Sequence, residues 1–382
     1  MRRRIFTEEH DAFRAMVRTF IADEVVPVYA DWEAAGHAPR SFARRLGDLG
    51  ITGLAVPEAY GGAGVNSYRF SAILSEEFAR ALVGPGSLRT HMDIVMPYFL
   101  AYASEEQRER WFPRLASGEM LTAIAMTEPG TGSDLAGITT RADRDGDGYV
   151  LNGAKTFITG GIIADAVIVV ARTGDDAADR RRGLTLLVVE DGMPGFRKGR
   201  NLPKLGLRPQ DTAELTFDDV RVPATNRLGE EGHAFTYLGN NLPKERLSIA
   251  VAAVAAAQAA LRITVDYVKD RKAFGQPVSS FQNTKFELAS VATELEAAQC
   301  LVDRAIEDLD DGLLTPVDAA KAKLFCTELQ SRVVDRCLQL FGGYGYMLEM
   351  PISRLYADAR VTRIYGGTSE VMRTIIGKSL GL

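Results

Sequence analysis

The spacing of apolar residues changes twice along the chain, and this limits the fold more than any other feature. Up to about residue 120, apolar side chains such as Phe13 and Val17 recur at helical spacing. The spacing then becomes two, which is typical of strands, and returns to helical near residue 231. We therefore expect an α+β protein that is mostly α, with a helical domain over 1–120, a β domain over 121–228 and a helical bundle over 229–382.

Local patterns predict individual elements within these regions. The apolar runs Val167 to Ala171, Leu184 to Val189 and Ala213 to Phe217 are expected to be strands. Asn152-Gly153, set between two strand-like segments, predicts a β-hairpin turn. Eight of the eleven residues from Ala250 to Ala260 are alanine, which allows helix axes to approach closely in a bundle.

Composition excludes several classes of protein. Hydrophobic residues make up 46% and charged residues 25% of the 382, as in soluble globular proteins. A formal net charge of −5 argues against a nucleic-acid binder. Cys300, Cys326 and Cys337 are too few for a disulfide framework or a metal site, so we expect buried thiols and no bound metal.

The start of the chain and the lengths of its apolar runs predict where the protein works. Met1 to Arg4 include three arginines. An acidic stretch follows them, where a signal peptide would have an apolar core. We also expect no membrane insertion, because no apolar run approaches the ~20 residues of a membrane span. The cytoplasm of a prokaryote is the simplest expectation.

The stretch Met126 to Asp134 carries the most informative motif, Met-Thr-Glu-Pro-Gly-Thr-Gly-Ser-Asp. Gly130 and Gly132 permit close backbone approach, and the loop also carries three hydroxyl side chains. A loop so rich in donors suits a flat heteroaromatic cofactor edged with carbonyls and ring nitrogens. Any short piece of it alone would be read as an ordinary polar turn.

Two later stretches carry further motifs. Residues 271–277 read Arg-Lys-Ala-Phe-Gly-Gln-Pro and Phe281-Gln282 follows, although a basic helix end would look the same. Residues 339–346 read Gln-Leu-Phe-Gly-Gly-Tyr-Gly-Tyr. In Tyr-Gly-Gly-Thr-Ser-Glu over 365–370, Thr368 or Ser369 can cap a last helix whose amides would attract a phosphate or a carbonyl oxygen.

In this order and spacing, the motifs resemble the acyl-CoA dehydrogenase family of flavoproteins. The resemblance runs from about residue 6 to 380 and includes the run from Val56 to Gly64. It implies an N-terminal helical domain, a central β-barrel and a C-terminal four-helix bundle, assembled as a homotetramer or a dimer. It also implies FAD as cofactor, an acyl-CoA substrate of fatty acid metabolism and an electron-transferring flavoprotein as electron acceptor.

The resemblance assigns roles to single positions. Contacts to the flavin ring and ribityl chain would come from Met126, Thr127, Gly132, Ser133, Phe157 and Thr159. The adenine-dinucleotide half, partly across a subunit interface, would be held by Arg271, Phe274, Gln282, Gln339, Gly342 and Gly343. Thr368 and Glu370 would close the site, and Ser133, Arg246 and Tyr365 would contact the substrate.

Dehydrogenation beside a thioester needs a base for the α-proton while a β-hydride leaves for flavin N5. Many family members carry a glutamate directly after the tyrosine that matches Tyr365, but Gly366 occupies that position here. The run Leu-Pro-Lys-Glu-Arg-Leu over 242–247 resembles the long-chain and isovaleryl types, which place the base on this helix. We therefore expect Glu245 to be the base and the Gly366 amide to polarise the thioester carbonyl. A glutamate following Pro243 near a helix start would also be favoured by the helix dipole alone.

Other functions remain open at this stage. An acyl-thioester oxidase, or a dehydrogenase acting on acyl groups attached to a carrier protein, would keep the same fold. A non-catalytic family member is supported by Gly366 alone. The length and branching of the acyl chain stay open, because the long-chain and isovaleryl types share this placement of the base.

Overall fold

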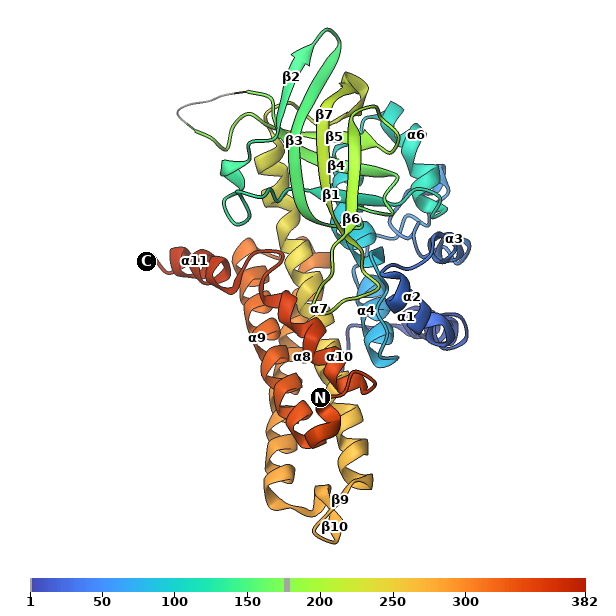
Figure 1. Cartoon of the computed structure of the whole chain (residues 1–382), viewed down its shortest axis with the longest axis vertical. Coiled ribbons are helices and arrows are strands. Elements are labelled where there is room, and N and C mark those ends of the chain that lie inside the picture. The colour runs from blue at the N-terminus through green and yellow to red at the C-terminus, as the bar shows by residue number, and fades with distance from the viewer. Residues whose placement is uncertain (1, 175–178) are drawn as a thin grey trace.

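The structure is a computed structural model, and it describes residues 2–174 and 179–382. Met1 of the basic start lies outside this part of the chain. The N-terminal region is helical, as predicted (Figure 1). Its α-helices are α1 (Glu8–Phe20), α2 (Tyr29–Ala35), α3 (Arg40–Asp48), α4 (Arg69–Arg80), α5 (Met96–Tyr102) and α6 (Glu105–Ala116), with a π-helical turn η4 (Thr90–Val95) before α5.

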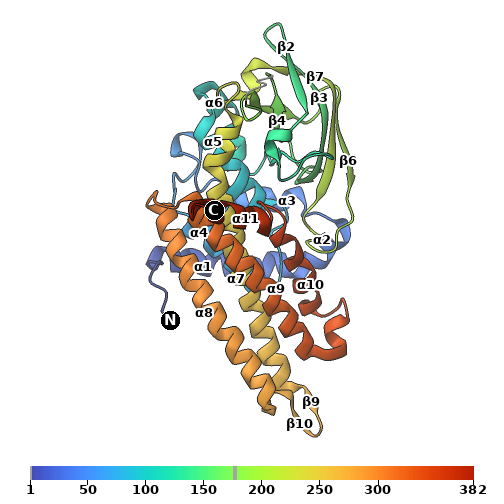
Figure 2. The same cartoon turned by 90° about the vertical axis from the view of Figure 1, so that its left-hand side faces the viewer.

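The central region is a curled eight-stranded sheet at one end of the molecule (Figures 1 and 2). Its strands are β1 (Thr122–Ala125), β2 (Arg141–Asp145), β3 (Gly148–Thr159), β4 (Ala166–Arg172), β5 (Leu184–Glu190), β6 (Phe196–Asn201), β7 (Thr212–Pro223) and β8 (Arg227–Leu228). They follow the order β6-β7-β3-β2-β4-β5-β8, and β1 pairs in parallel with β4. β4 is buried along its whole length, so this strand belongs to the core of the domain.

The C-terminal region is a bundle of antiparallel helices that extends away from the sheet (Figure 2). It consists of α7 (Ala234–Asp270), a small hairpin of β9 (Lys272–Ala273) and β10 (Gln276–Pro277), α8 (Gln282–Asp310), α9 (Pro316–Phe341), α10 (Pro351–Ala359) and α11 (Ser369–Ser379). The predicted fold class is therefore confirmed. The expected domain boundaries fall in the connections that precede β1 and follow β8.

The alanine-rich stretch of α7 forms the centre of the bundle. Ala250, Ala253, Ala257 and Ala260 are buried at helical spacing in one cluster with side chains of α8 and α9. Because alanine has only a methyl group, the axes of α7 and α9 can approach closely along this face. The first turns of α7 pack instead against strands of the sheet, through Leu238. One helix therefore joins the two domains.

The predicted hairpin at Asn152-Gly153 is wrong. β3 is continuous through both residues, and its register with β7 shifts there, which makes the dipeptide a β-bulge. Gly153 has φ +144°, and a Cβ on it would lie 2.7 Å from the Thr140 Oγ1. The Asn152 side chain donates to Asp219 Oδ1 and accepts from the Asp219 backbone N–H. The hairpin turn lies earlier, between β2 and β3.

The cysteines follow the prediction only in part. Cys326 and Cys337 are buried on α9, and burial raises the pKa of the Cys326 thiol to about 12. Cys300 is exposed, contrary to expectation. It lies between Ala298 and Val302 on α8, and those two residues take the side of the helix that faces the core.

α7 has the length and apolar composition of a membrane span, so the expectation that no apolar run approaches that length is wrong. Its 37 residues include an apolar stretch of which 61% is buried inside the protein. The helix packs against α4, α8 and α9. This packing accounts for its apolar character, because the core helix of a globular protein meets the same criteria.

Gly47 on α3 tests the packing of the N-terminal region, and Gly239 on α7 serves as its control. A Cβ on Gly47 of α3 would overlap the Ser117 backbone carbonyl after α6, whereas Gly239 of α7 has open space around it. We expect Gly47→Ala to lower the free energy of unfolding by about 1–3 kcal/mol through overpacking. Gly239→Ala should raise it by about 0.5–1 kcal/mol through helix propensity. Urea denaturation measures both, and equal effects of the two substitutions would contradict this packing.

Candidate active site

Glu245 lies well inside α7. The helix begins at Ala234 and continues through Pro243, so neither Pro243 nor Glu245 is at a helix start. The helix dipole favours a carboxylate only within the first turn. The helix dipole therefore does not explain why a glutamate is present at position 245.

The Glu245 carboxyl group is poorly solvated and incompletely paired. Its Oε2 atom is buried and has no hydrogen-bond partner among the described residues. Burial raises the pKa of Glu245 above its ordinary value, while the positive charges of Arg246, Arg89 and Lys323 act in the opposite direction. A dry carboxyl group with a free oxygen has the properties of a general base.

The turn from Tyr365 to Gly367 lies directly against Glu245. A Cβ on Gly366 would lie 3.5 Å from Glu245 Oε1 and would overlap the Ile249 side chain. Gly366 has φ +64°, which side-chain-bearing residues rarely adopt. A side chain at position 366 would therefore lie in contact with the Glu245 carboxyl group, and it would have to displace the Ile249 side chain.

Three cationic side chains hold this turn. Arg246 Nε donates to the Gly366 carbonyl at 3.3 Å, and Lys323 Nζ donates to the Gly367 carbonyl at 2.7 Å. Arg89 Nη2 donates to the Tyr365 hydroxyl at 2.9 Å. The structure thus brings together Glu245, Arg246, Tyr365 and Gly366, which the sequence predicted, with Arg89 and Lys323, which the sequence analysis missed.

A further missed residue is Tyr98 on α5. Its hydroxyl is buried without a hydrogen-bond partner in the described part of the chain. Burial and the nearby charge of Glu245 raise the pKa of Tyr98 well above its ordinary value, so it stays protonated. No motif in the sequence marks this residue.

The loop after β1 is held by a buried ion pair. Glu128 accepts from Lys155 Nζ at 2.8 Å and from the backbone N–H groups of Thr139 and Thr140 at 2.8 Å each. Lys155 also donates to the Met126 carbonyl at 3.0 Å. Although burial acts against ionisation, these donors lower the pKa of Glu128 to about 2. Glu128 therefore fixes the loop.

The remainder of this loop is open to solvent. The Thr127 carbonyl accepts from the Thr156 N–H on β3 at 2.9 Å, which joins the loop to the strand. Gly132 and Ser133 are exposed, and a Cβ on Gly130 or Gly132 would meet no atom within 4 Å. The loop can thus accept a ligand at its surface without steric conflict.

Phe157 on β3 is presented outward beside this loop. Its side chain is 68% exposed and its backbone has φ +59°, a strained conformation for an aromatic residue. Thr159 follows it on the strand and accepts a 3.4 Å hydrogen bond from Gln210. A protein normally covers an aromatic ring held in this way, so Phe157 offers a face for a planar group.

The residues predicted for the dinucleotide half lie at the opposite end of α7. Arg271, Gln339, Gly342 and Gly343 line one open cavity of about 550 Å³ with Tyr344, and the Arg271 guanidinium lies 5.5 Å from the centre of the Tyr344 ring. Phe274 and Gln282 are not among the lining residues. Phe274 is 96% exposed on the β9–β10 hairpin.

The last helix begins at the predicted cap. Thr368 Oγ1 accepts from the Val371 N–H at 3.3 Å at the start of α11. Glu370 is exposed, and its Oε1 atom lies 3.5 Å from Arg373 Nη1. Because Thr368 directly follows the Tyr365–Gly367 turn in the sequence, it lies at the edge of the site.

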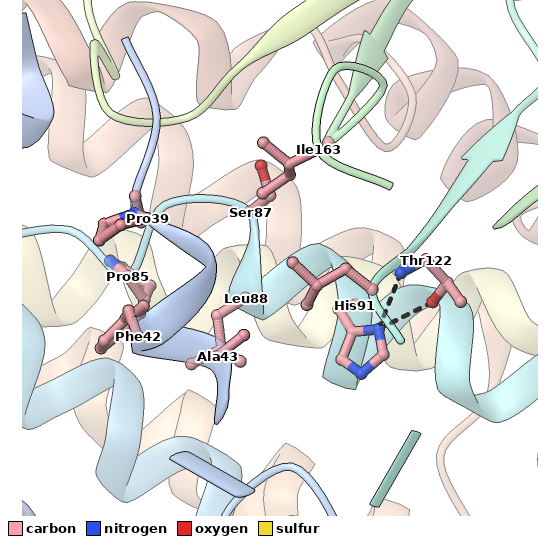
Figure 3. A pocket seen from close by; sticks show the side chains of 12 residues that line it. Pro39, Phe42, Ala43, Pro85, Ser87, Leu88, His91, Thr122 and Ile163 are labelled. Atoms are coloured by element: carbon pink, nitrogen blue, oxygen red, sulfur yellow. Dashed lines mark hydrogen bonds between the residues drawn. The ribbon is translucent and has the colours of Figure 1, made fainter. Parts of the chain in front are cut away.

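A small cavity between the helical region and the sheet is separate from this site. Figure 3 shows His91 and Thr122 on its wall, with the imidazole Nδ1 accepting from the Thr122 N–H at 3.2 Å. The cavity volume of about 20 Å³ has room for about one water molecule. It is too small for an acyl group. No group of three His, Cys, Asp or Glu side chains in residues 2–174 and 179–382 is arranged to hold a metal ion.

Three family descriptions match successive parts of the chain. Residues 7–119 match the N-terminal domain, 123–220 the middle domain and 232–381 the C-terminal domain of acyl-CoA dehydrogenase. The chain therefore belongs to the acyl-CoA dehydrogenase family, whose members are FAD-dependent oxidoreductases that act on acyl-CoA thioesters.

Individual relatives cover nearly the whole chain. The long-chain specific acyl-CoA dehydrogenase of Sus scrofa mitochondria is 46% identical over 378 residues, covering 99% of this chain and 88% of the relative. A crystal structure of acyl-CoA dehydrogenase from Geobacillus kaustophilus covers all of both chains at 47% identity with a TM-score of 0.97. A glutaryl-CoA dehydrogenase from Mycobacterium smegmatis in complex with FADH2 is 31% identical, covers 98% of this chain and 95% of its own, and has a TM-score of 0.89.

The residues present fit FAD as the cofactor. Phe157 leaves one aromatic face uncovered, and the glycines of the loop after β1 leave room for a ligand. At the far end of α7, Arg271 supplies a cation beside a cavity lined by the backbone of Gly342 and Gly343. An aromatic face suits a flavin ring, and a cation with accessible backbone suits a pyrophosphate.

The Glu128–Lys155 pair gives a test of the loop after β1. Glu128→Gln leaves the Lys155 ammonium buried without its carboxylate, so we expect a loss of about 3–5 kcal/mol in the free energy of unfolding. In the unaltered protein, the pKa of Glu128 is about 2 in the folded state, against an ordinary value of 4.5. Its contribution should therefore be complete above pH 4.5 and disappear as the pH falls toward 2. Denaturation between about pH 3 and 7 measures both effects, and a stability difference independent of pH would contradict this role.

Proposed function

We propose that this enzyme abstracts the α-proton of an acyl-CoA thioester with Glu245. The observation that carries the proposal is the position of the buried Glu245 carboxyl group directly beside Gly366, where a Cβ would lie 3.5 Å from Glu245 Oε1. The glycine places no side chain beside the glutamate, whose Oε2 is buried and has no hydrogen-bond partner among the described residues. The carboxyl group can therefore reach a substrate carbon from α7 instead of from the turn before α11.

The residues around Glu245 perform the other tasks of the reaction. The Gly366 amide donates to the thioester carbonyl and stabilises its negative charge as the α-proton leaves. Arg246 holds the Gly366 carbonyl, so the turn keeps its orientation. Met126, Thr127, Gly132, Ser133, Phe157 and Thr159 bind the flavin, and Ser133, Arg246 and Tyr365 contact the substrate. Bound FAD supplies a two-electron acceptor at flavin N5 for the hydrogen that leaves the β-carbon with its electron pair.

We further propose that the enzyme works as a homo-oligomer. At about 1.5 Å per residue, α7 extends roughly 40 Å from Glu245 to its end at Asp270. The residues proposed for the flavin ring lie at one end of this helix, and those proposed for the dinucleotide half lie at the other. One FAD cannot contact both sets in one chain. Arg271, Phe274, Gln282, Gln339, Gly342 and Gly343 would thus serve the cofactor of a neighbouring subunit, while Thr368 and Glu370 close the site.

An electron-transferring flavoprotein is the proposed electron acceptor and the cytoplasm the proposed location. The acceptor is the one that the family implies, and the location is the one that the sequence analysis predicted. A tetramer is the proposed assembly, with a dimer as the minimum that would complete the cofactor site.

Glu245→Gln tests the base. We expect turnover to fall by about 10²–10⁴-fold, because the amide cannot accept the proton. FAD content and acyl-CoA binding should stay unchanged, since neutral glutamine preserves the shape of the side chain. The matched control is Asp266→Asn, which removes an exposed carboxylate farther along α7. Near-normal turnover of Glu245→Gln in an assay with an artificial electron acceptor would rule out this assignment.

A further inference from the structure

Lys323 on α9 is a buried cation that the mechanism above does not use. Its side chain has no exposed surface, and among the described residues no carboxylate lies within 4.0 Å of its ammonium. The Nζ atom instead donates to the Gly367 carbonyl at 2.7 Å. Burying an ammonium group in this way lowers stability unless the group is fully paired. A contribution to the stability of the fold therefore does not explain why a lysine is buried at position 323.

The partner of Lys323 belongs to the turn beside the proposed base. Arg246 and Lys323 donate hydrogen bonds to two successive carbonyl oxygens, those of Gly366 and Gly367 respectively. Within the described part of the chain, the backbone N–H groups of Gly366 and Gly367 have no hydrogen-bond partner. The turn thus has both acceptors bound to the protein and both donors free.

We propose that Lys323 is a positioning residue for the dehydrogenation, which holds the Gly366–Gly367 turn so that its amides face the substrate carbonyl. This inference rests on the proposed function, in which the Gly366 amide binds the thioester. Hydrogen bonds in an oxyanion site act only when their donors are correctly placed, and a shift of about 1 Å costs about 100-fold in rate. Both residues of the turn are glycines with positive φ, at +64° and +98°, so its conformation needs external support.

The ammonium also acts on the proposed base through its charge. Glu245 experiences the positive charges of Arg246, Arg89 and Lys323, and the Tyr98 hydroxyl on α5 experiences the charge of Glu245. Burial lowers the pKa of Lys323 to about 8, helped by Arg246 and opposed by Glu328, Glu245 and Glu370. At neutral pH Lys323 is therefore still charged. Removing this charge should raise the pKa of Glu245, because its carboxylate loses a favourable partner.

The experiment compares Lys323→Met with Lys321→Met in the intact holoenzyme. Lys321 is exposed on the same helix and pairs with Asp318, so its replacement controls for the loss of a lysine from α9. For Lys323→Met we expect kcat to fall by about 10–100-fold with KM changed less than about threefold. The acid limb of the kcat profile should move to higher pH. Lys321→Met should match the unaltered enzyme in each respect.

Exchange of α-protons gives a second readout that does not require electron transfer. Acetyl-CoA has α-protons but no β-carbon, so its deuterium incorporation from heavy water reports proton abstraction alone. We expect Lys323→Met to slow this exchange by the same factor as kcat. Lys323→Gln keeps a hydrogen-bond donor without the charge, so it should recover part of kcat and retain the shifted acid limb.

The outcomes separate this inference from the function on which it rests. If Lys323→Met folds and keeps its kcat, its acid limb and its exchange rate, Lys323 is not a positioning residue. If the only change in Lys323→Met is a lower thermal stability, the inference is overturned in the same way. If Lys323→Met does not fold, Lys323→Gln decides, and an unshifted acid limb in that variant overturns the inference. If the unaltered enzyme shows neither turnover nor exchange, the proposed function itself fails.

Discussion

The burial of one carboxyl group among three cations is the interaction on which this site depends. Removing the Glu245 carboxylate from water is costly, and the charges of Arg246, Arg89 and Lys323 offset part of that cost. These cations come from α7, the segment after α4 and α9, which are distant in sequence. The site therefore forms only after the N-terminal helices and the bundle have packed against each other. The close packing of the alanine face of α7 provides that condition.

The length of α7 is the basis for the proposal that the cofactor is shared between subunits. Its first turns pack against the sheet and its last turns end at the β9–β10 hairpin, as Figure 1 shows. A rigid helix keeps the two sets of proposed FAD residues apart in one chain. Assembly of subunits would thus complete the site, and catalysis would depend on the quaternary structure. The 96% exposed ring of Phe274 at the far end is consistent with burial against a neighbour.

The sequence predicted those features that depend on local periodicity or on motifs. The order of helices, strands and helices, the cap at Thr368 and the placement of Glu245 on a helix all followed from it. The Asn152-Gly153 hairpin was wrong, because the pairing of β3 with β7 overrides the local preference of a dipeptide for a turn. Lys323 could not be found, since its contact with Gly367 joins residues far apart in the chain. Such contacts depend on tertiary packing, which no local pattern encodes.

The most direct test of this account is an anaerobic titration of the purified protein with saturated acyl-CoAs of increasing chain length. The absorbance of the oxidised flavin reports whether electrons leave the substrate. We expect one length class to bleach the flavin, which would establish the dehydrogenation and define the substrate. Retention of the oxidised-flavin absorbance with every acyl-CoA, in a protein shown to contain FAD, would contradict the account. Such a result would favour an acyl group attached to a carrier protein.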